Sequence, residues 1–146
     1  MTDPNAIMQL FERTGAYLRG HFRLTSGMHS PEYLQCAKVL AYPEYAEELG
    51  SGLAEAVRPL RAGRAPKLVV SPALGGVIIG HEVARALGAR FLFTEREAGG
   101  QMTLRRGFVI EPGETAVMIE DVVTTGGSSM EVIKILRQSG AEVLAA

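Results

Sequence analysis

Short, wholly apolar runs alternate with segments of helical spacing in the second half of the chain. Two of the helical segments, residues 77–87 and 130–138, are followed closely by Gly-Ala, after which the next apolar run begins. The apolar runs are residues 68–70, 91–93, 117–119 and 143–144. Strands without polar alternation are buried on both faces, which is typical of parallel strands joined by right-handed helical crossovers. The pattern predicts an α/β fold with a doubly wound parallel sheet.

The N-terminal part of the chain has a different pattern. Apolar residues at helical spacing predict a short helix over residues 3–12, with Asp3 or Asn5 as its cap. Residues 17–35 then predict two short strands, joined by a loop of turn-forming residues at 25–31. We therefore expect a helix followed by a small hairpin before the sheet begins.

Two further segments lie outside the predicted sheet. Pro43 suits the first turn of a helix that runs to about residue 57. The side chains expected to face inward from this helix are Leu49, Leu53, Ala56 and Val57. Residues 96–106 contain Gly99 and Gly100 among polar residues and arginines, which predicts an exposed hairpin or a mobile loop.

Composition restricts the classes of function. The 146 residues are 47% hydrophobic and 21% charged with a formal net charge of −1, which predicts one globular domain and gives no support for nucleic-acid or membrane-surface binding. Cys36 is the only cysteine, so an internal disulfide and a cysteine metal site are excluded, and we expect a small buried apolar residue there. We find neither a signal peptide nor a bilayer-spanning segment and expect a cytoplasmic protein.

The most informative stretch is the end of the third apolar run and the turn after it, residues 117–129. In an open parallel sheet, ligands bind beyond the carboxyl ends of the strands. Here the turn opens a helix, whose N-terminal N–H groups and partial positive charge suit a phosphate. Gly126 and Gly127 let the backbone approach a ligand closely. The residues that can donate hydroxyl hydrogen bonds are Thr124, Thr125, Ser128 and Ser129.

Two acids, Glu120 and Asp121, stand between the apolar run and the turn. Carboxylates accept hydrogen bonds, so this pair suits the vicinal hydroxyls of a ribose. The acids also lie where positive charge would develop on a ribosyl carbon during displacement. The acid pair and the turn that suits a phosphate together indicate a binding site for a ribose 5-phosphate.

A strand–turn–helix with Gly and Ser also occurs without any ligand, since Thr or Ser can simply cap the helix. The acid pair favours function, because paired carboxylates at a buried strand end are costly without partners. Two other phosphate motifs are excluded. No Gly-Lys-Ser/Thr is present, and no Gly-x-Gly-x-x-Gly follows a strand.

Residues 120–129 resemble the signature with which type I phosphoribosyltransferases bind 5-phosphoribosyl 1-diphosphate (PRPP). Residues 22–33 resemble the N-terminal element of the orotate phosphoribosyltransferases, which purine-specific relatives lack. Residues 71–76 are similar to the diphosphate-binding loop of that family, and Arg96-Glu97 to the start of its flexible loop. The resemblance covers essentially the whole chain.

The resemblance implies transfer of the 5-phosphoribosyl group from PRPP to orotate, giving orotidine 5′-phosphate and diphosphate in pyrimidine nucleotide biosynthesis. It implies Mg²⁺ as cofactor, held mainly by substrate oxygens and reached by the protein only through water. Residues 1–146 would form one domain, with a hood over the base at residues 1–35 and a PRPP-binding core at 66–146. The flexible loop of the family reaches into a neighbouring subunit, so a homodimer is implied.

The resemblance also assigns individual residues. Glu120, Asp121 and Arg96 are the catalytic residues, with both acids on the ribose hydroxyls. The PRPP-binding set continues through Val122 and Val123, and the 5-phosphate is assigned to Thr124, Thr125, Gly126, Gly127 and Ser128. Thr124 also lies near the carboxylate of orotate. Backbone N–H groups take the diphosphate, with cationic help from Arg96, at Ala73, Leu74, Gly75 and Gly76. A cis peptide, frequent in the family, is expected between Ala73 and Leu74.

The chain departs from the family pattern at several positions. Many members have a lysine at the positions of Thr25 and Gly75, and a lysine- and histidine-bearing loop where residues 98–101 stand. The arginines available as replacements are Arg96, Arg105 and Arg106. Members normally continue past Ala146 with strands and an arginine that clamps the base, so we expect residues 1–146 alone to bind PRPP better than orotate.

Two alternatives compete with this interpretation. The first is a phosphoribosyltransferase for a purine or another base, against which residues 22–33 argue. The second is a non-catalytic PRPP-sensing regulator that keeps the acid pair and the turn. Among the histidines, His29 is equally compatible with a ligand contact and a loop hydrogen bond, whereas His21 and His81 are expected to be structural.

Overall fold

The computed structural model describes residues 3–24, 26–61 and 63–146 and contains a five-stranded sheet and a separate two-stranded hairpin. The strands are β1 (Tyr17–Arg23), β2 (His29–Leu34), β3 (Leu68–Pro72), β4 (Arg90–Arg96), β5 (Met102–Leu104), β6 (Thr115–Met118) and β7 (Glu142–Ala145). The helices are α1 (Pro4–Arg13), α2 (Cys36–Leu40), α3 (Pro43–Val57), the 3₁₀ turn η1 (Arg58–Arg61), α4 (Gly76–Leu87) and α5 (Gly127–Gln138).

The main sheet has the order β5-β4-β3-β6-β7. Strands β4, β3, β6 and β7 are parallel, and only the edge strand β5 is antiparallel, as the far arm of a hairpin with β4. The predicted doubly wound α/β fold is therefore confirmed. The hairpin predicted at residues 96–106 is also present, with its turn at Glu97–Gln101.

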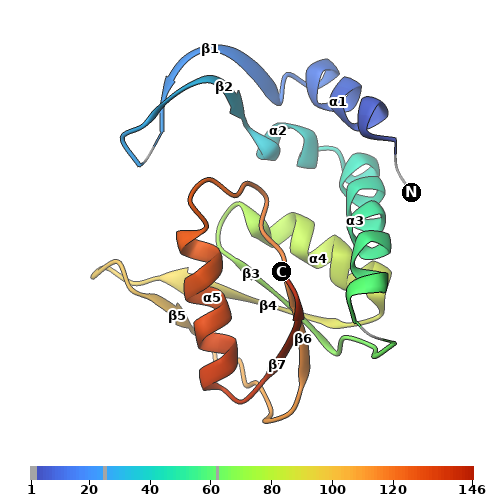
Figure 1. Cartoon of the computed structure of the whole chain (residues 1–146), viewed down its shortest axis with the longest axis vertical. Coiled ribbons are helices and arrows are strands. Elements are labelled where there is room, and N and C mark those ends of the chain that lie inside the picture. Colours follow the sequence, from blue (N-terminus) through green and yellow to red (C-terminus); the bar gives the residue numbers. More distant parts are fainter. Residues whose placement is uncertain (1–2, 25, 62) are drawn as a thin grey trace.

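Successive residues of the central strand face two different cores, which is why the strand carries no polar alternation. Val69 packs with α3 and α4 on one face, whereas Leu68 and Val70 pack with Val132 and Leu136 of α5 on the other. Figure 1 shows α5 and α4 on opposite faces of the sheet. On each face of the sheet, a helix therefore begins at the carboxyl end of a strand: α4 follows β3, and α5 follows β6.

The hairpin of β1 and β2 stands apart from the main sheet, together with α1 (Figure 1). Asp3 caps α1 by accepting a hydrogen bond from the Asn5 N–H (3.0 Å). The connecting loop is shorter than predicted, because β2 already begins at His29. Pro31 is tolerated inside β2 since the register shifts between Arg19 and Phe22, leaving a bulge at the proline position. Thr25, one of the lysine positions of the family, lies outside the described residues.

Two helix predictions need correction. Helix α3 has the predicted bounds, and the inward positions of Leu49 and Val57 are confirmed. Leu53 (38% exposed) and Ala56 are exposed instead, and the other buried residues of the helix are Ala46, Gly50 and Ala54. Gly50 has this position because a Cβ there would lie 2.5 Å from Glu82 Cβ of α4. Helix α5 begins at Gly127 instead of Met130, so the last part of the predicted turn is helical. The short helix α2 was not predicted at all.

Candidate functional site

The acid pair lies directly beyond the end of β6. The Ile119 N–H donates to Val70 O (3.0 Å), which carries the sheet one residue past the strand, and Glu120 and Asp121 follow, both half-buried. Ser129, which is 8% exposed, donates its hydroxyl hydrogen to Glu120 Oε2. Asp121 instead lies against the start of α4, where a Cβ on Gly75 would be 2.5 Å from Oδ2 and 2.6 Å from Oδ1. The two acids therefore have different neighbours.

The turn that follows the acids leads into α5 through Gly126, whose φ of 78° is in the left-handed region that favours glycine. The Met130 N–H donates to Gly126 O (2.9 Å), which closes the first helical turn. Within residues 3–24, 26–61 and 63–146, no side chain caps this helix. Thr124 and Thr125 are exposed on the turn. The alternative in which Thr or Ser merely caps α5 therefore has no support, and the helix N-terminus is open to an anion.

The loop between β3 and α4 is the second turn at this edge of the sheet. Its Ala73–Leu74 peptide is cis, as expected. The Ala73 N–H donates to Thr94 O (2.7 Å), so it is already paired. The N–H groups of Leu74, Gly75 and Gly76 have no acceptor among the described residues and can be offered to an anion. Of the four N–H groups assigned to the diphosphate, three are thus available.

Arg96 lies beside the α5 turn. Its Nη2 donates to Ser128 Oγ (3.2 Å) and pairs with Glu131 Oε2 (2.7 Å), while Nη1 donates to Gly100 O (2.7 Å). The guanidinium is therefore held next to the position expected for the 5-phosphate, whereas the resemblance had assigned it to the diphosphate. Glu131 was assigned no role from the sequence; its place in α5, three residues after Ser128 and thus on the same face of the helix, is the signal that could have identified it.

Arg106, another arginine considered as a replacement for the family's lysines, already has hydrogen-bond partners. Arg106 donates to both oxygens of Glu95 (2.7 Å each) and lies over the ring of Phe93. This bidentate hydrogen bonding lowers the pKa of Glu95. His21 and His29 contact each other across the hairpin (2.6 Å between ring nitrogens), whereas His81 is exposed on α4.

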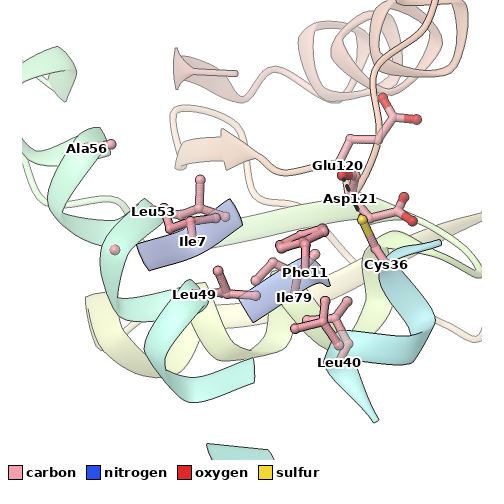
Figure 2. A pocket seen from close by; sticks show the side chains of 12 residues that line it. Ile7, Phe11, Cys36, Leu40, Leu49, Leu53, Ala56, Ile79, Glu120 and Asp121 are labelled. Atoms are coloured by element: carbon pink, nitrogen blue, oxygen red, sulfur yellow. Dashed lines mark hydrogen bonds between the residues drawn. The ribbon is translucent and has the colours of Figure 1, made fainter. Parts of the chain in front are cut away.

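A pocket of about 380 Å³ adjoins the acid pair. Figure 2 shows Glu120 and Asp121 at its polar end and apolar side chains from the helices around the rest. The apolar lining includes Phe11, Leu49, Leu53 and Ile79. Leu49 lines this pocket and also packs against the core, as predicted, whereas Leu53 lines the pocket and is otherwise exposed.

Cys36 joins the N-terminal segment to the acid pair. It is 5% exposed, as expected for a buried apolar residue, and its thiol donates to Asp121 O (3.5 Å). Burial, with a smaller contribution from the Asp121 carboxylate, raises the pKa of the Cys36 thiol to about 11. The thiol is therefore neutral at physiological pH.

No helix within the described residues is long and apolar enough to cross a bilayer. The chain matches none of the protein-family models. Among solved structures it resembles the orotate phosphoribosyltransferase of Aeropyrum pernix (TM-score 0.75, 26% identity, 94% of this chain and 76% of that one). It also resembles the adenine phosphoribosyltransferase of Leishmania tarentolae (TM-score 0.69, 22% identity, 98% and 73%), a likeness of fold alone.

Sequence identity is much higher to curated proteins that share one name. The chain is 55% identical to the orotate phosphoribosyltransferase of Pelotomaculum thermopropionicum over 140 residues, which are 96% of this chain and 71% of that protein. It is 51% identical to the enzyme of the same name from Thermotoga petrophila over 138 residues, 94% and 71% of the two chains. The chain therefore belongs to the orotate phosphoribosyltransferase family.

Proposed function

We propose that this chain transfers the 5-phosphoribosyl group of PRPP to orotate, giving orotidine 5′-phosphate and diphosphate in pyrimidine nucleotide synthesis in the cytoplasm. The observation that supports this most is the juxtaposition of a half-buried acid pair with an uncapped helix N-terminus at the same strand end. The names of the relatives at about half identity support orotate as the base.

The reaction forms a bond from a ring nitrogen of orotate to C1 of the ribose and breaks the bond from C1 to a diphosphate oxygen. The diphosphate leaves with the bonding electron pair, so positive charge develops on the ribosyl carbon, and the proton released by the ring nitrogen passes to the diphosphate or to water. Glu120 and Asp121 bind the ribose hydroxyls and stabilise that charge. No protein nucleophile is required, and the rate enhancement comes from positioning and electrostatics.

The phosphate groups of PRPP are assigned to the two turns. The 5-phosphate binds at the α5 N-terminus, with Thr124, Thr125 and Ser128 as hydroxyl donors and Arg96 beside them. The diphosphate binds at the α4 N-terminus through the N–H groups of residues 74–76. Residues 66–146 thus form the PRPP-binding core, and the hood segment (residues 1–35) covers the base, with Thr124 near its carboxylate.

The residues present suit Mg²⁺ as cofactor. Glu120 and Asp121 offer hard carboxylate oxygens, while no group of three or more His, Cys, Asp or Glu residues in the described part of the chain forms a cage for an ion. Mg²⁺ keeps several waters and usually binds through one or two carboxylates together with substrate phosphates. When bound, it would neutralise charge on the leaving diphosphate.

We also propose a homodimer. Helix α4 and the loop before it expose apolar side chains, with Leu74 at 87% and Ile78 at 48% exposure. A groove of about 350 Å³ between α4 and β4 contains Ile78, Phe91 and Phe93. Burying such a surface against a second copy would remove it from water. Sedimentation should give a dimer for this chain and a shift toward monomer for Ile78→Glu.

The proposed activity is tested by incubating the purified protein with PRPP, Mg²⁺ and orotate, adenine or uracil in parallel. We expect diphosphate release with orotate and none above background with the other bases, and loss of turnover with chelator. Turnover of adenine in place of orotate would overturn the base assignment. PRPP binding by calorimetry without turnover of any base would instead indicate a sensing protein.

A further inference from the structure

Two histidines from different strands meet on the hood hairpin, which consists of β1 and β2. The Nε2 atom of His21 lies 2.6 Å from Nδ1 of His29, and the two ring centroids are 4.7 Å apart. Both side chains are exposed to solvent. The sequence suggested separate roles for these residues, whereas the contact makes them one unit with two nitrogen atoms facing each other.

A bulge in β1 contributes to this contact. At the register shift of the hairpin, β1 has two residues, Gly20 and His21, where β2 has only Pro31. Bulges change the direction in which a side chain points, and Gly20 has no side chain, so His21 supplies the imidazole at this place. The backbone of the hairpin therefore brings together two histidines that are eight positions apart in the chain.

We propose that His21 and His29 form a binding site for a divalent transition-metal ion of the Zn²⁺ class. Imidazole nitrogens are preferred ligands of zinc, copper and nickel. In the observed contact, one of the two nitrogens carries a hydrogen and the other accepts it. The ion takes the place of this hydrogen, which moves to the second nitrogen of its own ring, so both rings stay neutral. Mg²⁺ prefers oxygen ligands, so this site is separate from the proposed magnesium site.

The geometry requires only a small adjustment of the two rings. Two nitrogens that bind one tetrahedral Zn²⁺ at about 2.0–2.1 Å lie about 3.3 Å from each other. The observed separation is 2.6 Å, so the rings must move apart by about 0.7 Å, which exposed side chains can do without disturbing the core. Within residues 3–24, 26–61 and 63–146, no third His, Cys, Asp or Glu completes a metal cluster. Water would therefore fill the other positions, and the ion could exchange.

The charges near the pair provide a way to test the site. Arg23 is the register partner of His29 and is exposed, so its positive charge opposes a bound cation. Residues 17–34 contain a single acid, Glu32, and its carboxylate accepts the hydroxyl hydrogen of Tyr17. The two imidazoles must therefore supply the affinity, and removing the nearby positive charge should increase it.

A bound ion would stabilise the hood hairpin. The hairpin is separate from the main sheet (Figure 1), and a two-stranded hairpin by itself is marginally stable in water. Because both ligands meet only when β1 and β2 are paired, an ion that binds them favours the closed hairpin by mass action. Zn²⁺ should therefore raise the melting temperature of the parent protein and should not raise that of a variant that lacks either histidine.

The site is tested by titrating Zn²⁺ alone into the protein in a calorimeter, with Mg²⁺ in excess to occupy carboxylate oxygens. We expect one Zn²⁺ per chain in the parent. His21→Ala and His29→Ala should each weaken binding at least about tenfold, because the second imidazole on the same hairpin acts at a high effective concentration. The matched control is His81→Ala, which removes the remaining histidine, exposed on α4, and should leave the affinity unchanged. Equal affinity in all four proteins, or the same loss in His81→Ala, would overturn the site.

Two further measurements identify the ligands. Cu²⁺ binds imidazole more tightly than the other divalent ions of its row, and its electron paramagnetic resonance spectrum should show coupling to two nitrogens in the parent. Either single variant should show coupling to one nitrogen, and an unchanged spectrum in both would contradict the proposal. Arg23→Ala should strengthen Zn²⁺ binding about two- to fivefold. Unchanged or weaker binding would place the ion away from His29. PRPP and orotate are absent from these measurements, so their outcome does not depend on the proposed function.

Discussion

The two turns that face the proposed ligand have the same architecture but carry their chemistry in different atoms. Both follow a central parallel strand, and both open a helix that begins next to glycine without a side-chain cap. The β6–α5 turn carries acids and hydroxyls, whereas the β3–α4 loop offers a cis peptide and free N–H groups. In the proposed site, the first turn therefore offers side chains to the ligand and the second offers backbone. Substitutions should therefore weaken ligand binding at the first turn when they remove a side-chain group. At the second turn they should weaken binding when they add side-chain atoms.

The largest effect is expected in the side-chain turn. Asp121→Asn removes a negative charge from the proposed ribose site, and Gly127→Val places a branched side chain at the proposed 5-phosphate site. Each should weaken PRPP binding by more than tenfold, because hydrogen bonds to charged groups are worth about 1.5–3 kcal/mol. Isothermal calorimetry with PRPP and Mg²⁺ measures this effect directly.

The fold should survive both changes. Asp121 pairs with no cation among the described residues, and Gly127 has a helical backbone with only Thr125 Oγ1 near its Cβ position (3.7 Å). Circular dichroism melts should therefore be close to those of the parent. Parent-like PRPP affinity in both variants would show that the ligand does not bind at this turn.

The next effect is a difference in stability between substitutions of Gly126 and Gly75, the glycines that precede α5 and α4. Gly126 has a φ of 78°, so Gly126→Ala should cost about 1–2 kcal/mol of unfolding free energy. Gly75→Ala, at a φ of −56°, adds no backbone strain, so it should cost less than Gly126→Ala and only through the Asp121 carboxylate, which must move away from the new Cβ. Urea unfolding of the two variants side by side gives this difference. Equal destabilisation would mean that backbone conformation is not what distinguishes the turns.

The same distinction explains how far the sequence could be interpreted. The α/β alternation, the acid pair and the order of the motifs were all visible, because apolar strands and carboxylates are properties of single residues. The sequence did not show that Glu120 and Asp121 have different neighbours. Ser129 is one of several hydroxyls in a row, and nothing in the sequence says that it faces Glu120 while Ser128 faces Arg96.

Errors in the secondary structure have related causes. The predicted inward face of α3 included Leu53 and Ala56, which are exposed, because close packing against α4 selects the face with Gly50 and Ala54. Leu53 lines the pocket instead. The start of α5 was placed too late because Gly and Ser are poor helix formers. In the structure the helix nevertheless begins at Gly127, and Ser129 of its first turn is buried with its hydroxyl on Glu120.

A smaller effect is expected from the ion pair that holds Arg96 beside the side-chain turn. Glu131 competes with the 5-phosphate for this guanidinium (2.7 Å), and both side chains are nearly half exposed. Glu131→Gln should therefore strengthen PRPP binding about two- to fivefold while changing stability by less than about 1 kcal/mol. The matched control is Glu55→Gln, which breaks an exposed pair with Arg58 on α3 and should leave PRPP affinity unchanged. Weaker binding in Glu131→Gln would mean that the glutamate presents Arg96 to the ligand.

The smallest effect lies where the hood segment meets the acid pair. Burial raises the pKa of the Cys36 thiol to about 11, and the thiol donates to Asp121 O in its neutral form. Because the folded-state pKa is above that of the unfolded chain, about 8.5, this contribution to stability is fully present below pH 8.5. It is lost as the pH rises toward 11, where the unfolded thiol ionises and the buried one resists ionisation. The unfolding free energy of the parent should therefore fall more steeply over this interval than that of Cys36→Ala. Since tyrosines and lysines titrate in the same range in both proteins, only the difference between the two slopes reports on Cys36. Parallel slopes would show that the thiol is as free to ionise in the folded chain as in water, and that Cys36 is not buried at the start of α2.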